Sequence, residues 1–484
     1  MNKKSNFLKF LIVFFLVTVQ ACNKADVPPD GTGDFTFADD ITLSADELAA
    51  EIVFDSLRND LFSRINEQHL FASLYAGWRS QVTDDPLYKL FKAMPKGALL
   101  HAHASAIGDV DWIINRAVNT SGCFIFLGEE GLGPVWGQLG IAPYHTTTTG
   151  WVPIEEYTAQ EPDWQSTMRE WFTLGTEDEQ TEDAWTEFEL IFQRIDGFIS
   201  YRPVFTEYYQ YALEKLAAEG ISYLELRTSF DHLLDEDGQW IDDDGLINIY
   251  NSIVNEVKAT YPEFNLALII TGWRGDTQEG VTQQVERANG LFSTVPGFVV
   301  GFDLVGEEDG WNNNGYYSEA LAQAMMPLFL HGGESVLITN HNISDAINLQ
   351  AKRISHAINL VLFPDLEGEI LQNDVLLELC PISNQALRYT NDLAKHPGKG
   401  YLQRGLQGTL GSDDPALFGT EGLTDDYFVA YLAWNLDLRS VKKLIINSIN
   451  YGGMPSGEKE IHLAAFTEKW DLFIEDVVSN PFDF

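Results

Sequence analysis

Short apolar segments recur along the chain from Gly97 onward, and longer amphipathic segments separate them. Eight such segments are present, at 98–105, 222–229, 265–272, 297–306, 327–334, 353–360, 375–383 and 408–415. Short buried strands that alternate with helices form parallel sheets, because each helix returns the chain to the start of the next strand. A (β/α)8 barrel contains eight of these strand–helix units. The pattern therefore predicts an α/β fold of the TIM-barrel type, with a doubly wound open sheet as the alternative.

Two additions to this barrel, which we expect to span 97–484, are visible in the sequence. Ser44 and Glu47 form a Ser-x-x-Glu capping box ahead of a periodic apolar stretch, so a helix is expected to begin there. We expect 44–96 to form an N-terminal helical extension. The segment at about 124–200 separates the first two expected strands and is acidic and rich in tryptophan. We interpret it as an insertion on the barrel and not as a separate domain.

The first residues have the features of a signal peptide at 1–21. Lysines precede a short apolar run, which ends at Val19-Gln20-Ala21-Cys22. These four residues resemble a bacterial lipoprotein box, in which the cysteine is acylated and becomes the first mature residue. The sequence therefore predicts a lipoprotein of the bacterial cell envelope, anchored outside the cytoplasm on the periplasmic or outer-membrane side. An ordinary cleaved signal with a chance cysteine is the alternative. Residues 22–43 are rich in Asp, Pro, Gly and Thr, which is typical of an anchor with a flexible tether.

The charge and the cysteine count exclude several kinds of partner and site. The formal net charge is −42, which argues against nucleic acid as a partner and leaves the lipid anchor as the expected membrane contact. Apart from Cys22, the chain has only Cys123 and Cys380, with no CxxC motif. A disulfide framework and a cysteine-built zinc site are therefore not expected.

The first apolar segment ends in two histidines, His101 and His103. Strand side chains alternate between faces, so both imidazoles are expected to point the same way at the end of the strand. Two imidazoles on one face suit the binding of a metal ion. Two buried histidines that only make hydrogen bonds are the alternative.

Other metal-binding or acidic residues follow later segments. His331 and Glu334, then His356, then Asp413 and Asp414, stand at or just after the ends of three further segments. In a barrel, the carboxyl ends of all strands meet at one mouth, so these side chains are expected to lie together. The pattern therefore predicts a metal-dependent active site at this mouth.

Several longer motifs resemble those of a known family. "HAH", "HGGE", "ISH" and "SDDP" occur in the order found in the adenosine and AMP deaminase superfamily. "MPKGALLHAH", "YLELRTSFDHLL", "GFDLVGEED", "LELCPISNQALRYTNDLAKHP" and "GSDDPALFG" more closely resemble the secreted adenosine deaminase-related growth factor branch. The similarity runs from about Leu87 to about Tyr451. It implies hydrolytic deamination of adenosine or 2′-deoxyadenosine to inosine or 2′-deoxyinosine and ammonia, outside the cytoplasm.

The resemblance also implies a metal and its ligands. One zinc ion per chain would activate water for attack on the amino-bearing ring carbon of adenine. The ligands that match the family are His101, His103, His331 and Asp413. From spacing alone, Asp413 and Asp414 could exchange roles, and only the resemblance assigns them.

Four further residues receive roles from the same resemblance. His356 would orient the water and take or stabilise its proton. Glu334 would protonate the purine ring, which requires a carboxyl that is protonated at rest. Asp414 would contact another ring nitrogen, and the backbone N–H of Gly306 would contact the purine. We interpret Glu225 and Arg227, in "LELR", as a structural pair.

One departure from the family pattern concerns the sugar. The family usually has an acidic residue just after His-x-His, whereas this chain has Ala104, Ser105 and Ala106, with Asp109 and Asp111 further on. Recognition of the ribose therefore stays open, and a deaminase of another adenine derivative is an alternative. A non-catalytic binding or signalling protein on the same fold is a second alternative. The sequence also leaves open whether the chain forms a homodimer.

Overall fold

A computed structural model describes residues 34–129, 131, 133–175, 184–230 and 233–480. The predicted signal peptide, Cys22 and most of the predicted tether lie outside these residues. Phe35–Phe484 form one compact unit, which contains all of the described helices and strands. No helix among the described residues has both the length and the apolar character needed to cross a membrane.

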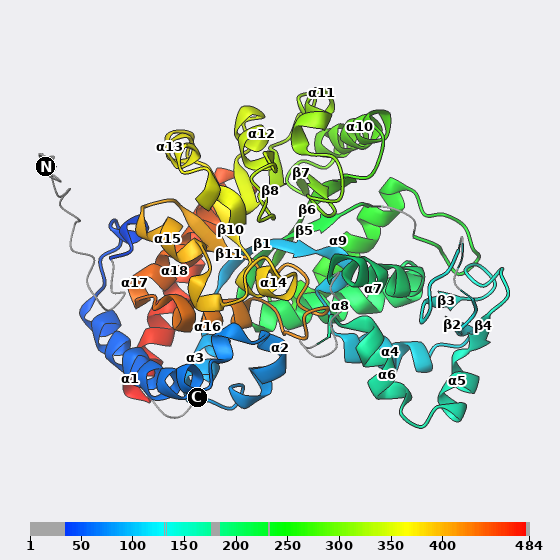
Figure 1. Cartoon of the computed structure of the whole chain (residues 1–484), viewed down its shortest axis with the longest axis horizontal. Helices are drawn as coiled ribbons and strands as arrows, with labels where there is room; N and C mark the ends of the chain where they lie inside the picture. The colour runs from blue at the N-terminus through cyan, green and yellow to red at the C-terminus, as the bar shows by residue number, and fades with distance from the viewer. Residues whose placement is uncertain (1–33, 130, 132, 176–183, 231–232, 481–484) are drawn as a thin grey trace, which may run out of the picture. The chain divides into compact units, whose positions relative to one another are not determined.

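Eight parallel strands form the centre of the molecule (Figure 1). They make two four-stranded sheets, in the orders β1-β5-β6-β7 and β8-β9-β10-β11. The strands are β1 (Gly97–His103), β5 (Ile221–Thr228), β6 (Asn265–Trp273), β7 (Val299–Val305), β8 (Phe329–Gly332), β9 (Arg353–His356), β10 (Leu376–Leu379) and β11 (Gly408–Leu410). Each strand falls within or largely within one of the eight predicted segments.

Backbone contacts join the two sheets at both seams. Phe302 on β7 bridges to Leu328, next to β8, and Ala102 on β1 bridges to Asp413, just after β11. Both bridges are parallel, so the strands close into a ring in chain order. The TIM-barrel prediction is therefore confirmed, and the alternative of an open sheet is wrong.

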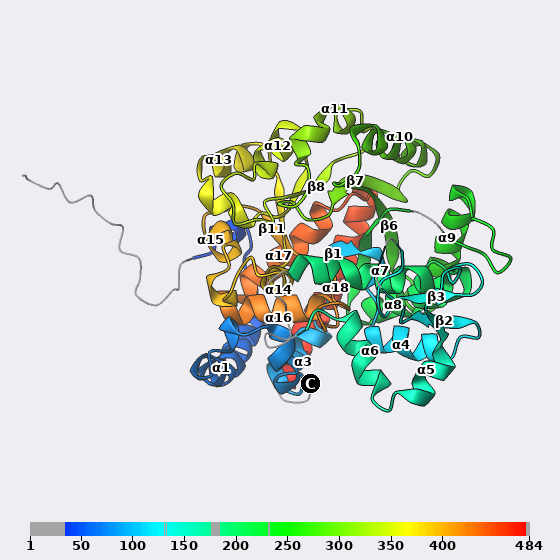
Figure 2. The same ribbon diagram turned by 45° about the vertical axis from the view of Figure 1, so that its right-hand side comes forward.

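Helices follow the strands and cover the outside of the barrel (Figure 2). The strands read as nearly continuous apolar runs because both of their faces are buried, by side chains in the barrel and by helices outside it. The main covering helices are α8 (Arg202–Ala218), α9 (Asp243–Thr260), α10 (Gln278–Thr294), α12 (Asn342–Asn348), α13 (Asp365–Gln372), α14 (Pro381–Ala386), α15 (Gly398–Gln403), α16 (Leu423–Trp434), α17 (Leu438–Asn450) and α18 (Ser456–Ser479).

The segment before the barrel is helical and packs on the last helices of the chain. Helix α1 (Ala45–Glu67) begins at the predicted capping box, where the Glu47 N–H donates to Ser44 Oγ at 3.2 Å. The Glu47 side chain also accepts a hydrogen bond from Trp470 Nε1 on α18 at 2.7 Å. Helix α3 (Pro86–Ala93) then leads into β1. The extension is thereby joined to α18, the last helix of the chain.

The insertion between β1 and β5 has its own small sheet, which the sequence did not indicate. Strands β2 (Cys123–Phe126), β3 (Leu139–Ile141) and β4 (Trp151–Pro153) are antiparallel, in the order β3-β2-β4. The surrounding helices are α4 (Val110–Val118), α5 (Ile154–Gln160), α6 (Trp164–Phe172) and α7 (Ala184–Ile199). Helix α7 packs against β3 on one side and contacts Ala104–Ala106, directly after β1, on the other. The insertion therefore reaches the mouth of the barrel.

Candidate metal centre and substrate pocket

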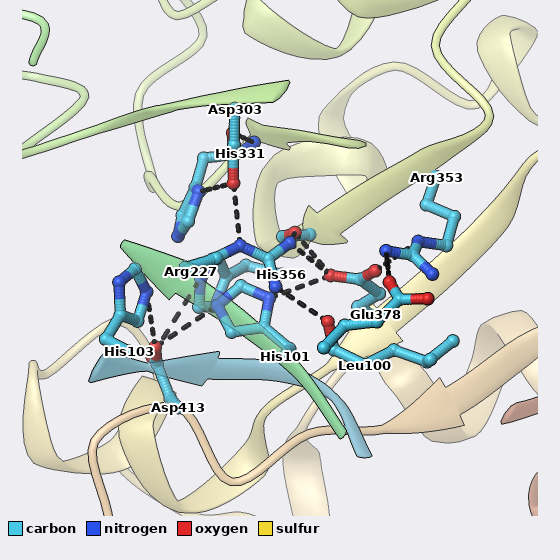
Figure 3. A network of polar contacts seen from close by, with 12 residues as sticks. Leu100, His101, His103, Arg227, Asp303, His331, Arg353, His356, Glu378 and Asp413 are labelled. Carbon is cyan, nitrogen blue, oxygen red and sulfur yellow. Dashed lines mark hydrogen bonds and ion pairs between the residues drawn. The ribbon is translucent and has the colours of Figure 1, made fainter. Parts of the chain in front are cut away.

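Three histidines and one aspartate meet at the carboxyl ends of the barrel strands (Figure 3). His101 and His103 end β1, His331 lies in β8, and Asp413 follows β11. One nitrogen or oxygen atom from each lies within 4.8 Å of the corresponding atoms of the others. Asp413 Oδ1 is 3.2 Å from His101 Nε2 and 3.1 Å from His103 Nε2. The four residues thus form a compact set of donor atoms.

Two buried carboxylates orient two of the imidazoles. His331 Nδ1 is 2.7 Å from Asp303 Oδ2, and His101 Nδ1 is 2.8 Å from Glu378 Oε2. Although burial raises the pKa of both carboxyls, nearby positive charge holds each pKa well below its usual range, so both accept hydrogen bonds as carboxylates. Each ring therefore donates its Nδ1–H and directs the Nε2 lone pair toward the centre.

The charge states of the cluster suit a metal cation. Burial lowers the pKa of His331 to about 4 and also lowers the pKa of His103, so both rings are neutral near pH 7. Burial alone would raise the pKa of Asp413, but His101 and His103 hold it well below its usual range. For His101, Asp413 and Glu378 outweigh burial and raise the pKa, so a metal would displace a proton there. Three imidazole nitrogens and one carboxylate oxygen fit zinc and related transition metals.

The backbone at two of these residues is held in an uncommon conformation. Asp413 has φ 56° and His356 has φ 65°, both in the left-handed region. The Asp413 N–H donates to the His101 carbonyl at 3.1 Å, and the His103 N–H donates to the Asp413 carbonyl at 3.2 Å. Such strained positions cluster at functional sites, where the surrounding structure maintains them. Here the backbone hydrogen bonds lock Asp413 beside the two histidines of β1.

Glu334 is a buried acid next to this cluster. It is 2% exposed, and Glu308 holds its loop by accepting the N–H groups of Gly333 at 3.0 Å and Glu334 at 3.1 Å. Burial, together with the charges of Asp413 and Glu308, raises the pKa of Glu334 well above its usual value. This shift favours the protonated form of Glu334, which has a proton to donate.

His356 lies behind the cluster, with one ring nitrogen facing it. Its Nδ1 accepts a hydrogen bond from Asn384 Nδ2 at 3.0 Å. Its Nε2 is 4.0 Å from Asp413 Oδ2 and has no hydrogen-bond partner among the described residues. A buried nitrogen without a partner is costly, so Nε2 is suited to a group bound at the centre.

A cavity of about 430 Å³ opens above the donor cluster. Its inner wall includes Glu334, Gly306 and Asp414. Gly306 has φ 107°, and a Cβ there would lie 3.1 Å from Trp273 Nε1, so the chain comes close to the cavity only as glycine. Asp414 is buried with a pKa well above its usual value, because of burial and the adjacent Asp413. Its Oδ1 makes no hydrogen bond within the described part of the chain, which leaves it available to a ligand.

The outer wall of the cavity comes from the insertion. Helix α7 contributes the aromatic residues Trp185, Phe188 and Phe192 and the polar residues Glu189, Gln193 and Asp196. Asp109 and Asp111, the nearest acids after His-x-His, are used elsewhere. Asp109 caps α4 by accepting the Trp112 N–H at 3.0 Å, and Asp111 forms an ion pair with Arg169. These polar residues of α7 line the same cavity as Ala104 and Ser105, which follow His-x-His.

Glu225 and Arg227, which we interpreted as structural, are both buried and form ion pairs with residues of other strands. Glu225 forms its ion pair with Arg353, and Arg227 forms ion pairs with Asp303 and Glu378. Neither Asp303 nor Glu378 was predicted from the sequence to be part of the site. Each is a single charged residue in an otherwise apolar strand, and this sequence signal could have been used to predict both of them.

All predicted site residues within the described part of the chain come together at one mouth. Cys22, the predicted lipidation site, is outside it. The residues at the mouth are His101, His103, Gly306, His331, Glu334, His356, Asp413 and Asp414.

Comparisons with known proteins identify the family. The family model "adenosine deaminase" matches residues 164–466. Adenosine deaminase 2 of Dictyostelium discoideum is 30% identical over 453 residues, which covers 90% of this chain and 83% of that protein. These matches include the barrel from β5 onward and, for the relative, most of the insertion.

Solved structures show the same fold at lower identity. Adenine deaminase from Arthrobacter aurescens superposes with a TM-score of 0.57 at 21% identity and covers 77% of this chain and 98% of its own. An amidohydrolase from Burkholderia ambifaria, solved with bound zinc, has a TM-score of 0.57 at 14% identity and covers 81% of this chain and 95% of its own. The chain therefore belongs to the adenosine deaminase family and is a metal-dependent hydrolytic deaminase of adenine derivatives.

Proposed function

We propose that the chain is a zinc-dependent deaminase of adenosine and 2′-deoxyadenosine that acts outside the cytoplasm. The observation that carries this proposal is the position of Glu334. A protonated acid lies beside a set of metal donors, and both line one cavity of a size that suits a nucleoside. In this proposal His101, His103, His331 and Asp413 hold one zinc ion per chain. The zinc-bound amidohydrolase of the same fold supports the choice of metal.

The residues around the ion have different roles in the hydrolysis. A zinc ion held by these residues would lower the pKa of bound water toward 7 and so supply hydroxide. His356 accepts the Asn384 amide at Nδ1, so its proton is on Nε2, which faces the centre and can donate a hydrogen bond that orients the attacking water. Glu334 donates its proton to a ring nitrogen of the purine, which makes the neighbouring amino-bearing carbon electrophilic. Addition of hydroxide to that carbon forms the new C–O bond. The hydroxyl proton then passes to the amino group, which leaves as ammonia, and the carbon keeps the oxygen as the 6-oxo product. The proton released when the water ionises restores Glu334.

The purine is recognised by groups on the inner wall of the cavity. The raised pKa of Asp414 favours its protonated form, which can donate a hydrogen bond to another ring nitrogen. The Gly306 backbone can approach the base because no side chain stands between them. These contacts fix the ring so that Glu334 and the attacking water face the same edge.

The composition of the outer wall favours a nucleoside over a nucleotide. Among the described residues that line the cavity, Arg227 is the only lysine or arginine, and it is bonded to Asp303 and Glu378. Glu189 and Asp196 on α7 add negative charge where the sugar would lie. Carboxylates accept hydrogen bonds from sugar hydroxyls but repel a phosphate. We therefore propose that α7 replaces the missing acidic residue in sugar recognition.

A panel of adenine compounds tests this function. Ammonia release should be measured with adenosine, 2′-deoxyadenosine, adenine and AMP, together with the metal content of the same preparation. We expect about one zinc per chain and a kcat/KM for adenosine at least about tenfold above that for AMP, since a repelled phosphate costs more than about 1.4 kcal/mol. A preference for AMP or free adenine would favour the alternative of another adenine derivative. Zinc-loaded protein that binds adenosine without releasing ammonia would favour a binding protein.

The location is tested at the N-terminus. We propose that Cys22 is acylated and holds the protein at the bacterial cell envelope. Cys22→Ser, expressed in a bacterium that processes lipoproteins, should move the protein from the membrane fraction to the soluble periplasm or the medium. Cys123→Ser changes a buried cysteine of β2 and should leave the distribution unchanged. Membrane association that survives Cys22→Ser would contradict acylation at this residue.

A further inference from the structure

Arg227 is buried in the barrel and connects two parts of the metal centre (Figure 3). It lies on β5 and is 1% exposed. Its Nε donates to Asp303 Oδ2 at 2.7 Å, and its Nη2 donates to Glu378 Oε2 at 2.7 Å. The same Nη2 donates to Ser355 Oγ at 3.1 Å. Its Nη1 donates to the carbonyl of Leu100, the residue before His101, at 2.8 Å. One guanidinium thus reaches four different segments of the barrel.

The oxygen atoms that Arg227 holds are the ones that orient the histidines. Asp303 Oδ2 accepts from both Arg227 and His331 Nδ1, and Glu378 Oε2 accepts from both Arg227 and His101 Nδ1. Every path from His331 to His101 through these bonds passes through the guanidinium. Because the fork of an arginine is planar and rigid, it fixes the distance and angle between the two carboxylates.

Arg227 uses most of its donors for groups behind the histidines. Four of its five N–H groups are used in the bonds to Asp303, Glu378, Ser355 and Leu100. Its charge is matched by the two carboxylates, which are also fully buried. Although it borders the cavity, its contacts point to the groups behind the histidines.

We propose that Arg227 is a positioning residue of the metal centre, which sets metal affinity by aligning His101 and His331 from behind. The inference rests on the ligand set of the proposed function. Partners that orient metal-bound histidines typically contribute about 10–100-fold to metal affinity. A lysine at this position keeps the charge but offers one point of contact, so it cannot span both carboxylates.

The test compares metal affinity in Arg227→Lys and Ser355→Ala with that of the parent chain, by competition with a chelator. Ser355 Oγ bonds both Arg227 and Glu378 Oε2, the latter at 2.8 Å, so its removal loosens the same connection with little change in volume. We expect a loss of roughly 10–100-fold for Arg227→Lys and a smaller loss for Ser355→Ala, with KM for adenosine little changed at saturating zinc. Cobalt-substituted protein should show shifted visible absorption bands in Arg227→Lys, because those bands report ligand geometry.

Arg79→Lys is the matched control for the loss of a guanidinium that pairs with a buried carboxylate. Arg79 pairs with the buried Asp425 at 3.0 Å, among the N-terminal helices and away from the donor cluster. It should lower thermal stability without changing metal affinity. Parent-like zinc affinity in both Arg227→Lys and Ser355→Ala would overturn the inference, as would an equal loss in Arg79→Lys. If Arg227→Lys does not fold, the zinc affinity of Ser355→Ala alone tests the inference. A parent chain that binds no zinc would instead refute the proposed function, which separates the two failures.

Discussion

Glu334→Gln is expected to lower kcat by at least roughly 10²–10⁴-fold, or about 3–5 kcal/mol of activation free energy, while zinc content stays at the parent level. The amide has almost the same shape as the carboxyl and can still donate a hydrogen bond, so the purine should still bind. It has no proton to transfer. Because the raised pKa of Glu334 favours its uncharged form, the substitution should change the charge around the metal little. Measurement of kcat, zinc stoichiometry and product affinity on one preparation checks the result.

Glu219→Gln is the matched control for this substitution. Glu219 is also a buried glutamate with a raised pKa, about 7, but it lies beside Lys96 and Thr424, away from the cavity. It should leave kcat of the folded enzyme unchanged. Near-normal turnover in Glu334→Gln would refute its role as proton donor. Loss of zinc in Glu334→Gln would show that the carboxyl is part of the metal site.

The positions of the strands could be predicted because two signals coincide in them. Strands such as β10, with the sequence LLEL, are buried on both faces and are short enough to separate cleanly from the helices between them. Polar residues at their carboxyl ends, such as His331 on β8, could be predicted to meet because a closed parallel barrel brings those ends to one mouth. Neither inference needs knowledge of which side chains touch.

The contacts behind the histidines could not be predicted, because they depend on which side chains touch across the barrel. The link from Arg227 to Asp303 and Glu378 joins β5, β7 and β10, which are far apart in sequence. The spacing of Glu225 and Arg227 puts the two on one face of the strand, but their partners come from other strands, which local spacing does not identify. The same limit applies to α7, whose place at the cavity depends on how the insertion folds back over Ala104–Ala106.

The two adjacent aspartates show what geometry adds to spacing. Their order in "SDDP" leaves either one free to be the ligand. In the structure, Asp413 lies within 3.2 Å of His101 and His103, and its left-handed backbone turns it toward them. Asp414 faces the cavity with an unbonded oxygen and a raised pKa. This difference favours Asp413 as the metal ligand and Asp414 as the contact to the purine, and it predicts different effects for their amide variants.

The metal ligands should give the largest effects of all. His331→Ala removes a donor atom and leaves Asp303 without the ring that it orients, so the zinc affinity should fall by more than the roughly 10–100-fold expected for a residue behind a ligand. Activity should fall to background, because water without a metal has a pKa of about 15.7 in place of about 7 and supplies almost no hydroxide at neutral pH. Asp413→Asn keeps the shape and loses the charge, so it should weaken zinc binding, whereas Asp414→Asn leaves an uncharged donor in place, so it should keep zinc and change KM little.

The matched control for His331→Ala is His462→Ala, which removes a buried imidazole at the other end of the barrel. His462 Nδ1 lies 3.0 Å from Ser222 Oγ, at the start of β5, so its loss should lower stability but change neither zinc content nor kcat.

Zinc binding should also weaken as the pH falls, because protons compete with the metal for the histidines, and first for His101, whose pKa is raised. Zinc content and ammonia release, measured for each variant and again after chelation and zinc return, check these expectations. Full activity in chelated protein, or in His331→Ala without zinc, would show that the reaction does not depend on this metal centre.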